Sequence, residues 1–189
     1  ISSFSKKLNN CQIGIGGQNC HESKSYGAHT GLINSRMLKN IGAHFVIIGH
    51  SENREKGENN RLINQKIKSA LEAKLKVIFC IGETLSEKRK KKTKFILSKQ
   101  IKVGLKNIKN SSNIFIAYEP VWAIGTGIIP KSNDLFKTVE FIKSKFKGKS
   151  PKVLYGGSVN PKNITNLKEI NNIDGFLIGG ASQSAKKFI

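Results

Sequence analysis

Short apolar runs alternate with amphipathic helical segments along this chain. Within the runs, apolar residues follow one another instead of alternating with polar ones, so we expect strands that are buried on both faces, as in a parallel sheet. The runs are Ile13–Gly17, Phe45–Ile48, Val77–Ile81, Ile114–Tyr118, Val153–Tyr155 and Phe176–Ile178.

Between the runs, apolar residues recur at helical spacing. Arg61–Leu75 carries them on one stripe, and Asn133–Phe146 repeats the pattern. Pro161 suits the first turn of a helix that continues toward Leu167, and the basic run Lys88–Lys92 is expected to begin another helix. No Pro- or Gly-rich linker interrupts the alternation, which predicts an α/β fold in one domain.

The carboxyl ends of the predicted strands carry glycine or polar residues. They read "GGQN", "IIGHSE", "FCIGET", "AYEP", "LYGGS" and "LIGG". In a (β/α)8 barrel this rim builds the active site, whereas a doubly wound open sheet gathers its ligand groups at one switch point. A complete barrel runs to about 250 residues. We therefore expect a single partial barrel domain over residues 1–189, with about the first two strand–helix units missing before Ile1.

Charge is the strongest bulk feature, with a formal net charge of +21. The basic residues are nearly all Lys and are spread over every predicted helix. A nucleic-acid site would need clustered Arg and exposed aromatic residues, whereas Arg occurs here only at positions 36, 54, 61 and 89. The distribution favours a solvated Lys-rich surface and no nucleic-acid partner. A Lys-rich nucleic-acid-binding protein is the alternative from another functional class.

Membrane and metal partners are not expected. No apolar stretch approaches the roughly 18 residues of a membrane-spanning helix. Cys11, Cys20 and Cys80 lack C-x-x-C spacing, which favours free thiols in a reducing cytoplasm and speaks against a zinc site. The predicted localisation is therefore cytoplasmic.

Two strand ends carry residues suited to proton transfer. Glu119 ends an apolar run and is followed at once by Pro120, and His50 follows the run that ends at Ile48. A carboxylate base and an imidazole that converge on one pocket suit proton abstraction beside a carbonyl. For His50 alone, a satisfied histidine at the edge of the core is the plainer interpretation.

Glycine-rich turns follow the later strands. Gly156-Gly157-Ser158 and Gly179-Gly180 come after the last two strands, where barrels commonly bind phosphate through backbone N–H groups. Gly125-Thr126-Gly127 follows Glu119 and could hinge a lid that excludes water. An ordinary flexible connection is the alternative for this last turn.

Five motifs together resemble the triosephosphate isomerase family, in order and across nearly the whole chain. They are "GGQNC…GAHTG", "GHSENR", "AYEPVWAIGTG", "LYGGSV" and "DGFLIGGAS". The resemblance implies a TIM barrel that interconverts dihydroxyacetone phosphate and D-glyceraldehyde 3-phosphate in glycolysis and gluconeogenesis, without cofactor or metal. Another phosphate-binding barrel enzyme, acting on a sugar or indole phosphate, is a second possibility that "YEPVWAIGTG" counts against.

The resemblance also assigns roles. Glu119 would take the carbon-bound proton and return it to the neighbouring carbon, and His50 would polarise the carbonyl as a neutral donor and stabilise the enediolate. The substrate phosphate would be held by main-chain amides. These belong to Gly125, Ser158, Gly179 and Gly180. Supporting positions would be Thr30, Ser51, Glu52 and Tyr155.

The resemblance also implies roles for two segments. Pro120–Pro130 would be the lid, with Tyr155 beneath it. The loop Gln18–Gly31, with Thr30 near its tip, would form a homodimer by reaching the partner subunit.

The chain departs from the family pattern at several points. Leu32 stands where an acidic residue is usual and Asn53 where Arg is usual, and Ile128-Ile129 makes the distal hinge more apolar. The family's Asn-x-Lys segment at the end of the first strand, whose ammonium contacts the substrate, has no counterpart after Ile1. An inactive barrel fragment is therefore the alternative within the family, and we expect this chain alone to have little isomerase activity.

Overall fold

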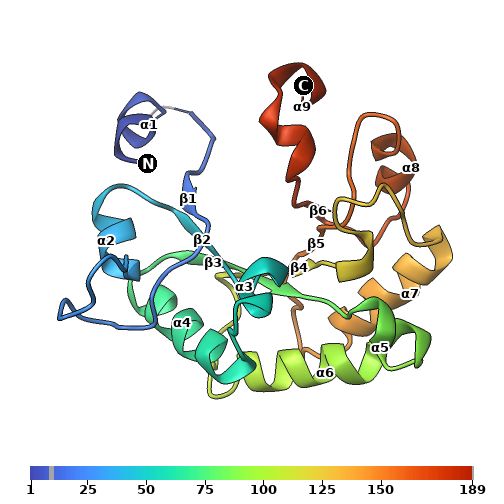
Figure 1. Cartoon of the computed structure of the whole chain (residues 1–189), viewed down its shortest axis with the longest axis horizontal. Coiled ribbons are helices and arrows are strands. Elements are labelled where there is room, and N and C mark those ends of the chain that lie inside the picture. Colours follow the sequence, from blue (N-terminus) through green and yellow to red (C-terminus); the bar gives the residue numbers. More distant parts are fainter. Residues whose placement is uncertain (9–10, 189) are drawn as a thin grey trace. The chain divides into compact units, whose positions relative to one another are not determined.

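A computed structural model describes residues 1–8 and 11–188 and shows a parallel α/β architecture (Figure 1). Its strands are β1 (Gly16–Gly17), β2 (Phe45–Ile48), β3 (Lys76–Ile81), β4 (Ile114–Tyr118), β5 (Val153–Tyr155) and β6 (Gly175–Phe176). They follow one another in the sheet in chain order, and the pairs β1–β2, β2–β3, β4–β5 and β5–β6 are parallel. The predicted α/β class with parallel strands is confirmed.

The inner strands agree with the apolar runs better than the outer ones. β2, β4 and β5 have the predicted bounds, and β3 begins one residue earlier. β1 and β6 each have one neighbour in the sheet, and each pairs over only two residues. The predicted strands Ile13–Gly17 and Phe176–Ile178 were therefore too long: Ile13 is exposed, and Leu177 and Ile178 lie beyond β6.

Helices separate the strands as expected. They are α1 (Ser2–Lys7), α2 (Ser35–Asn40), α3 (Ser51–Glu55), α4 (Asn60–Glu72), α5 (Leu85–Arg89), α6 (Thr93–Gly104), α7 (Ser132–Lys143), α8 (Ile164–Lys168) and α9 (Ala185–Phe188), with short 3-10 turns η1 (Val121–Ala123) and η2 (Gly180–Gln183). The Asn59 side chain caps α4 by accepting hydrogen bonds from the backbone N–H groups of Arg61 and Leu62, each 3.0 Å long. α4 ends before the predicted Leu75 because Lys74 adopts a left-handed conformation with φ 58°.

Two predicted helix starts were wrong. The run Lys88–Lys92 does not begin one helix, because α5 ends at Arg89 and Lys91 turns the chain with φ 57° before α6 begins. The stretch after Pro161 is a turn, and α8 begins only at Ile164. Asn160 nevertheless caps this turn, because its side chain accepts from the backbone N–H of Lys162 at 2.9 Å and its carbonyl oxygen accepts from the backbone N–H of Ile164 at 3.1 Å.

The chain divides into two compact units, each with its own apolar interior. The first unit comprises Ile1–Phe79 and Lys102–Phe115, and the second comprises Cys80–Ile101 and Ile116–Ile189. In the first unit α4 packs on β2, and the fully buried residues include Val46, Ile48, Ile63, Ile67 and Val77. In the second unit they include Leu97, Ile116, Leu135, Val139, Ile142 and Tyr155. That residues 1–189 act as a single domain stays a prediction.

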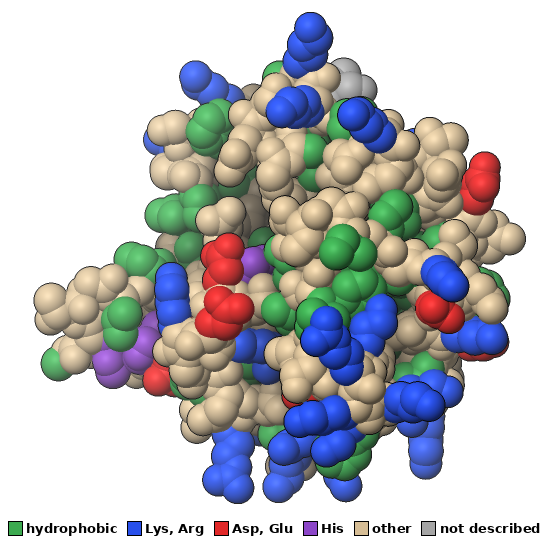
Figure 2. Space-filling model, turned by 45° about the vertical axis from the view of Figure 1, so that its right-hand side comes forward, with side chains coloured by type: hydrophobic (Ala, Val, Ile, Leu, Met, Phe, Trp, Pro, Cys, Tyr) green, Lys and Arg blue, Asp and Glu red, His purple; other side chains and the backbone are tan. Residues whose placement is uncertain are grey.

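The outer surface is rich in Lys. Figure 2 shows Lys and Arg side chains at several separate places on the face in view, with acidic side chains between some of them. Among the described residues, no helix combines the length and the apolar character that a bilayer-spanning helix needs.

Candidate active site

Glu119 follows β4 directly and is one of the most buried charged residues described, with 2% of its surface exposed. Its backbone N–H donates to the carbonyl oxygen of Ile81 at 2.8 Å, so the hydrogen bonding between β4 and β3 reaches this residue. Pro120 comes next with φ −60° and cannot donate to the ladder. The strand therefore stops at the carboxylate, as the sequence predicted.

Two glycines, which have no Cβ atom, make room for Glu119. A Cβ atom on Gly156 would lie 2.9 Å from Glu119 Cγ, and one on Gly82 would lie 1.7 Å from the Glu119 carbonyl oxygen. Any side chain at either position would have to displace Glu119. The turn at Gly156 was predicted only as a phosphate loop, and the structure gives it a second task in packing against the carboxylate side chain.

Ser158 contacts two interior positions of residues 120–130, which we call the 120–130 segment. Its hydroxyl donates to the carbonyl oxygen of Ala123 at 2.6 Å, and its backbone N–H donates to the same oxygen at 3.0 Å. The hydroxyl oxygen also accepts from the backbone N–H of Gly127 at 3.0 Å. Gly125 and Gly127 have positive φ angles of 67° and 76°. These contacts fold the segment over the turn that carries Ser158.

Glu83 was not singled out in the sequence, although it follows β3 in the quoted end "FCIGET". Its side chain is buried and accepts from the Tyr118 hydroxyl at 3.2 Å on each carboxylate oxygen, and from Trp122 Nε1–H at 3.0 Å. The backbone N–H of Val121 donates to its carbonyl oxygen at 3.1 Å. Burial raises the pKa of the Tyr118 phenol well above its ordinary value, and the Glu83 carboxylate raises it further. The signal that could have found Glu83 is a carboxylate two residues after the end of a buried strand.

Tyr155 is fully buried in β5. Within the described residues its hydroxyl has no hydrogen-bond partner, and burial raises the pKa of its phenol. A Cβ atom on Gly157 would lie 2.2 Å from this hydroxyl oxygen, so the glycine allows the backbone to pass close over it. A buried hydroxyl without a partner costs about 1–3 kcal/mol.

Gly179 and Gly180 lie at the start of η2 and are exposed. A Cβ atom at either position would meet nothing within 4 Å. The carbonyl oxygen of Gly179 accepts from the backbone N–H and the hydroxyl of Ser182 at 2.9 and 2.6 Å. The backbone here is thus held by a turn and has open space beside it.

His50 lies in the first unit, at the N-cap of α3. Its Nδ1 accepts from the backbone N–H of Glu52 at 3.4 Å, so the neutral ring carries its proton on Nε2. Ser51 is buried and Glu52 is exposed on the first turn of α3. Arg54 supports the preceding turn by donating from Nε to the carbonyl oxygen of Gly49 at 2.7 Å.

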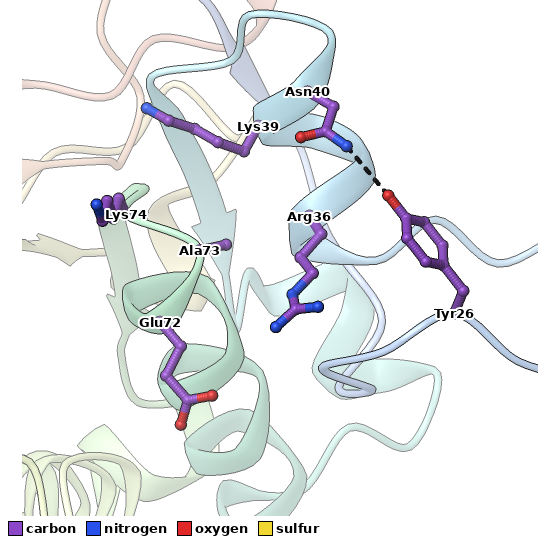
Figure 3. A pocket seen from close by; sticks show the side chains of 7 residues that line it. All are labelled: Tyr26, Arg36, Lys39, Asn40, Glu72, Ala73 and Lys74. Carbon is purple, nitrogen blue, oxygen red and sulfur yellow. Dashed lines mark hydrogen bonds between the residues drawn. The ribbon is translucent and has the colours of Figure 1, made fainter.

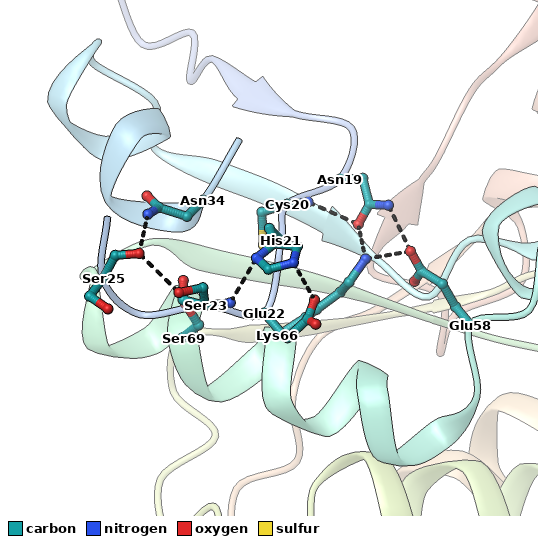
Figure 4. A network of polar contacts seen from close by, with 10 residues as sticks. All are labelled: Asn19, Cys20, His21, Glu22, Ser23, Ser25, Asn34, Glu58, Lys66 and Ser69. Atoms are coloured by element: carbon teal, nitrogen blue, oxygen red, sulfur yellow. Dashed lines mark hydrogen bonds and ion pairs between the residues drawn. The ribbon is translucent and has the colours of Figure 1, made fainter. Parts of the chain in front are cut away.

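The beginning of the loop Gln18–Gly31 is tied to α4 by a polar network (Figure 4). Asn19 donates to Glu58 at 2.8 Å, and the Lys66 ammonium donates to Asn19 Oδ1 at 3.2 Å and pairs with Glu58. Only 7% of the Lys66 side chain and 12% of the Glu58 side chain are exposed. Lys66 is therefore an exception to the solvated Lys-rich surface that the sequence predicted. Toward the other end of the loop, Thr30 is exposed.

A hollow of about 360 Å³ in the first unit is lined by none of the predicted site residues (Figure 3). Its lining consists of Tyr26, Arg36, Lys39, Asn40, Glu72, Ala73 and Lys74. Tyr26 accepts from Asn40 at 3.0 Å, and Glu72 pairs with Lys24. Lys39 and Lys74 lie at helix C-termini, where cations complement the helix dipole.

No group of three or more His, Cys, Asp and Glu side chains is placed to hold a metal ion within residues 1–8 and 11–188.

The second unit therefore brings together the Glu119 carboxylate, the Gly156–Ser158 turn and the 120–130 segment, while His50 lies in the first unit. The family model for triosephosphate isomerase matches residues 1–189. The chain belongs to the triosephosphate isomerase family.

Several relatives agree with this membership. A triosephosphate isomerase of Thermodesulfovibrio yellowstonii is 43% identical over 196 residues, covering 100% of this chain and 79% of the relative. One from Mycoplasmopsis pulmonis is 44% identical over 190 residues, covering 100% and 75%. The crystal structure of triosephosphate isomerase from Bartonella henselae matches with a TM-score of 0.87 and 38% identity, over 97% of this chain and 79% of that one. The family resemblance and the TIM-barrel relationship read from the motifs are confirmed.

Proposed function

We propose that the protein is a triose-phosphate isomerase that interconverts dihydroxyacetone phosphate and D-glyceraldehyde 3-phosphate through an enediolate. The observation that carries this proposal is the buried Glu119 carboxylate at the end of β4, seated against Gly156 in a chain that belongs to this family. The reaction moves a proton between neighbouring carbons and leaves the oxidation level of the molecule unchanged, so it calls for neither a redox cofactor nor a metal.

Glu119 is the base in this proposal. It removes the proton from the carbon beside the carbonyl and returns it to the adjacent carbon, so one carboxylate serves both steps. Its backbone is fixed by the bond to Ile81 and its side chain by the close approach of Gly156. A base that is held in place before the substrate arrives loses little freedom in the transition state.

His50 is the electrophile. Because its Nδ1 accepts the bond from Glu52, its Nε2–H is the donor that can face the substrate oxygen. A preorganised donor aimed at the oxygen where negative charge develops stabilises the enediolate, typically by about 3 kcal/mol. In this proposal His50 and Glu119 converge on one substrate, with Ser51 and Glu52 supporting the turn that carries the imidazole.

The phosphate is held by main-chain amides of Gly125, Ser158, Gly179 and Gly180. The open space beside Gly179 and Gly180 supports this assignment, because an anion must approach the backbone closely to accept from N–H groups. The 120–130 segment acts as the lid. Its closure excludes water, which protects an enediolate phosphate from losing its phosphate. Tyr155 lies beneath the lid.

The proposal also includes a homodimer and a cellular location. The loop Gln18–Gly31 contacts a second copy of the chain in a homodimer, with Thr30 beside the partner's active site. The exposure of Tyr26 and Thr30, together with the firm attachment of the loop at Asn19, fits such a contact. The enzyme would act in the cytoplasm, in glycolysis and gluconeogenesis.

A coupled isomerase assay in both directions tests the proposal. Glu119→Gln removes the base without changing its shape, and we expect kcat to fall by about 10²–10⁴-fold. Glu140→Gln is the matched control, because Glu140 is exposed on α7, and it should keep the parental rate. Equal activity of Glu119→Gln and the parent would remove Glu119 from the mechanism. Binding of 2-phosphoglycolate without turnover in the parent would instead favour a non-catalytic member of the family.

A further inference from the structure

Trp122 is the single Trp of the chain and sits in η1, at the beginning of the 120–130 segment. Two groups contact it from different directions. Glu83 accepts from the indole N–H at the ring edge, and the Lys88 ammonium lies 3.2 Å from the centroid over the ring face. The edge and one face of the same ring are therefore both held.

Both groups come from one short stretch of chain. Glu83 lies two residues before α5, and Lys88 lies in the last turn of this helix. A capping box fixes the start of α5, because the Thr84 hydroxyl accepts from the Glu87 backbone N–H at 3.3 Å and the Glu87 carboxylate accepts from the Thr84 backbone N–H at 2.8 Å. The two contacts on Trp122 are thus presented by a locally braced frame.

The Lys88 side chain is held against the ring more closely than a freely solvated lysine would be. Burial lowers the pKa of its ammonium below the ordinary value, while the carboxylates of Glu83 and Asp134 act in the opposite direction. An ammonium over the face of Trp is attracted by the quadrupole of the ring. The Lys88 ammonium therefore contacts the Trp122 ring as well as solvent.

The position of Trp122 bears directly on Glu119. Only two residues separate them, and the Val121 backbone N–H between them donates to the carbonyl oxygen of Glu83. The indole ring is joined to this stretch of backbone, which the bond to Glu83 also holds. Contacts to the ring and to the Val121 backbone therefore act together on the chain just after β4.

We propose that Lys88 is a positioning residue for the 120–130 segment, whose ammonium holds the face of Trp122 while Glu83 holds its edge. The role rests on the proposed isomerase function, in which this segment is the lid. Lys88 touches no substrate. It acts by favouring the position of Trp122 seen in the structure over positions in which the ring has rotated away. The expected preference is about two- to fivefold, as for an exposed cation over an aromatic ring.

The simplest competing role for Lys88 is a long side chain that merely shields an apolar ring. Three variants separate the two roles. Lys88→Gln removes the charge, Lys88→Arg keeps it, and Lys90→Gln removes a charge from the residue just after α5, where no aromatic ring contact is described. Thermal unfolding of each variant shows whether the fold is intact.

Two measurements on the full chain decide the role. Acrylamide quenching and anisotropy of Trp122 fluorescence report the mobility of the ring without substrate, and steady-state kinetics report the lid. We expect Lys88→Gln to increase quenching and to lower kcat/KM by about two- to fivefold. Lys88→Arg should resemble the parent in both measurements, and so should Lys90→Gln.

The proposal is overturned if Lys88→Gln leaves quenching and kcat/KM at the parental values, or if Lys90→Gln changes them equally. It is also overturned if Lys88→Arg behaves like Lys88→Gln, because a positive charge at this position would then not be what holds the ring. If no variant turns over, the parent included, the result matches the little activity expected of this chain alone, and the proposed function fails separately. Quenching with and without 2-phosphoglycolate then still decides whether Lys88 holds Trp122.

Discussion

The Cγ atom of Glu119 lies where a methyl group on Gly156 would approach it to 2.9 Å. The carboxylate at the end of β4 is therefore seated in space that another strand end leaves free. Gly82 makes the corresponding room for the Glu119 backbone. The position of Glu119 therefore depends on the missing Cβ atoms of Gly82 and Gly156 as much as on its own hydrogen bonds.

Gly156→Ala should misplace the Glu119 carboxylate. The added methyl group meets a side chain that is buried and has little room to move, so we expect kcat to fall by about 10²-fold, as for a small misplacement of a reacting group. Urea unfolding should show a loss of about 1–3 kcal/mol from overpacking. A variant with parental kcat and stability would show that Glu119 can shift without consequence.

Ser158→Ala should loosen the 120–130 segment. It removes the hydroxyl contacts with Ala123 and Gly127, so we expect kcat/KM to fall by about tenfold while the free energy of unfolding falls by only about 1–2 kcal/mol. Ser144→Ala is the control, because this exposed hydroxyl donates to the backbone of α7 at 2.8 Å. Equal kinetic effects of the two substitutions would contradict a special role for Ser158.

Lys66→Met should destabilise the first unit. It leaves the Glu58 carboxylate with 12% exposure and without its cation, a change that typically costs about 3–5 kcal/mol. Urea unfolding measures the loss. Lys68→Met on the same helix provides the comparison and should cost less than about 1 kcal/mol, because no ion pair is described for Lys68. Similar losses for both variants would mean that the network with Asn19 contributes little.

Alkaline pH should weaken the fold through its buried phenols. Burial raises the pKa of Tyr155 and Tyr118 above 10.0, so the folded chain keeps protons that the unfolded chain releases. Their contribution to stability is complete below about pH 10 and is lost as pH rises further, by at most about 1.4 kcal/mol per pH unit for each group. Unfolding free energies between pH 8 and 11 should fall less steeply for Tyr155→Phe than for the parent. Identical slopes would contradict the assignment.

The sequence predicted the inner strands well and the polar contacts poorly. Ile114–Tyr118 is bounded by a polar turn on one side and by Glu119-Pro120 on the other, so its limits follow from local chemistry. The pairing of Glu83 with Trp122 spans 39 positions, and no local pattern encodes it. Lys66 is likewise indistinguishable in the sequence from the exposed lysines around it.

The helix ends were harder to predict from the sequence than the inner strands and easier than the polar contacts. Lys74 adopts a positive φ angle that Gly or Asn usually provides at such a position, so the end of α4 carried no recognisable signal. The convergence of Glu119 with His50, the phosphate contacts and the homodimer stay predictions, because each depends on groups that lie in different units or in different molecules.

Gly82 and Gly156 have a consequence for the interpretation of mutational scans. Neither side chain can bind substrate or transfer a proton, yet substitution at either position would displace Glu119 and depress activity. A scan of every position would therefore score both glycines alongside the base itself. In this protein, sensitivity to substitution identifies the residues that make room for the base as well as the base itself.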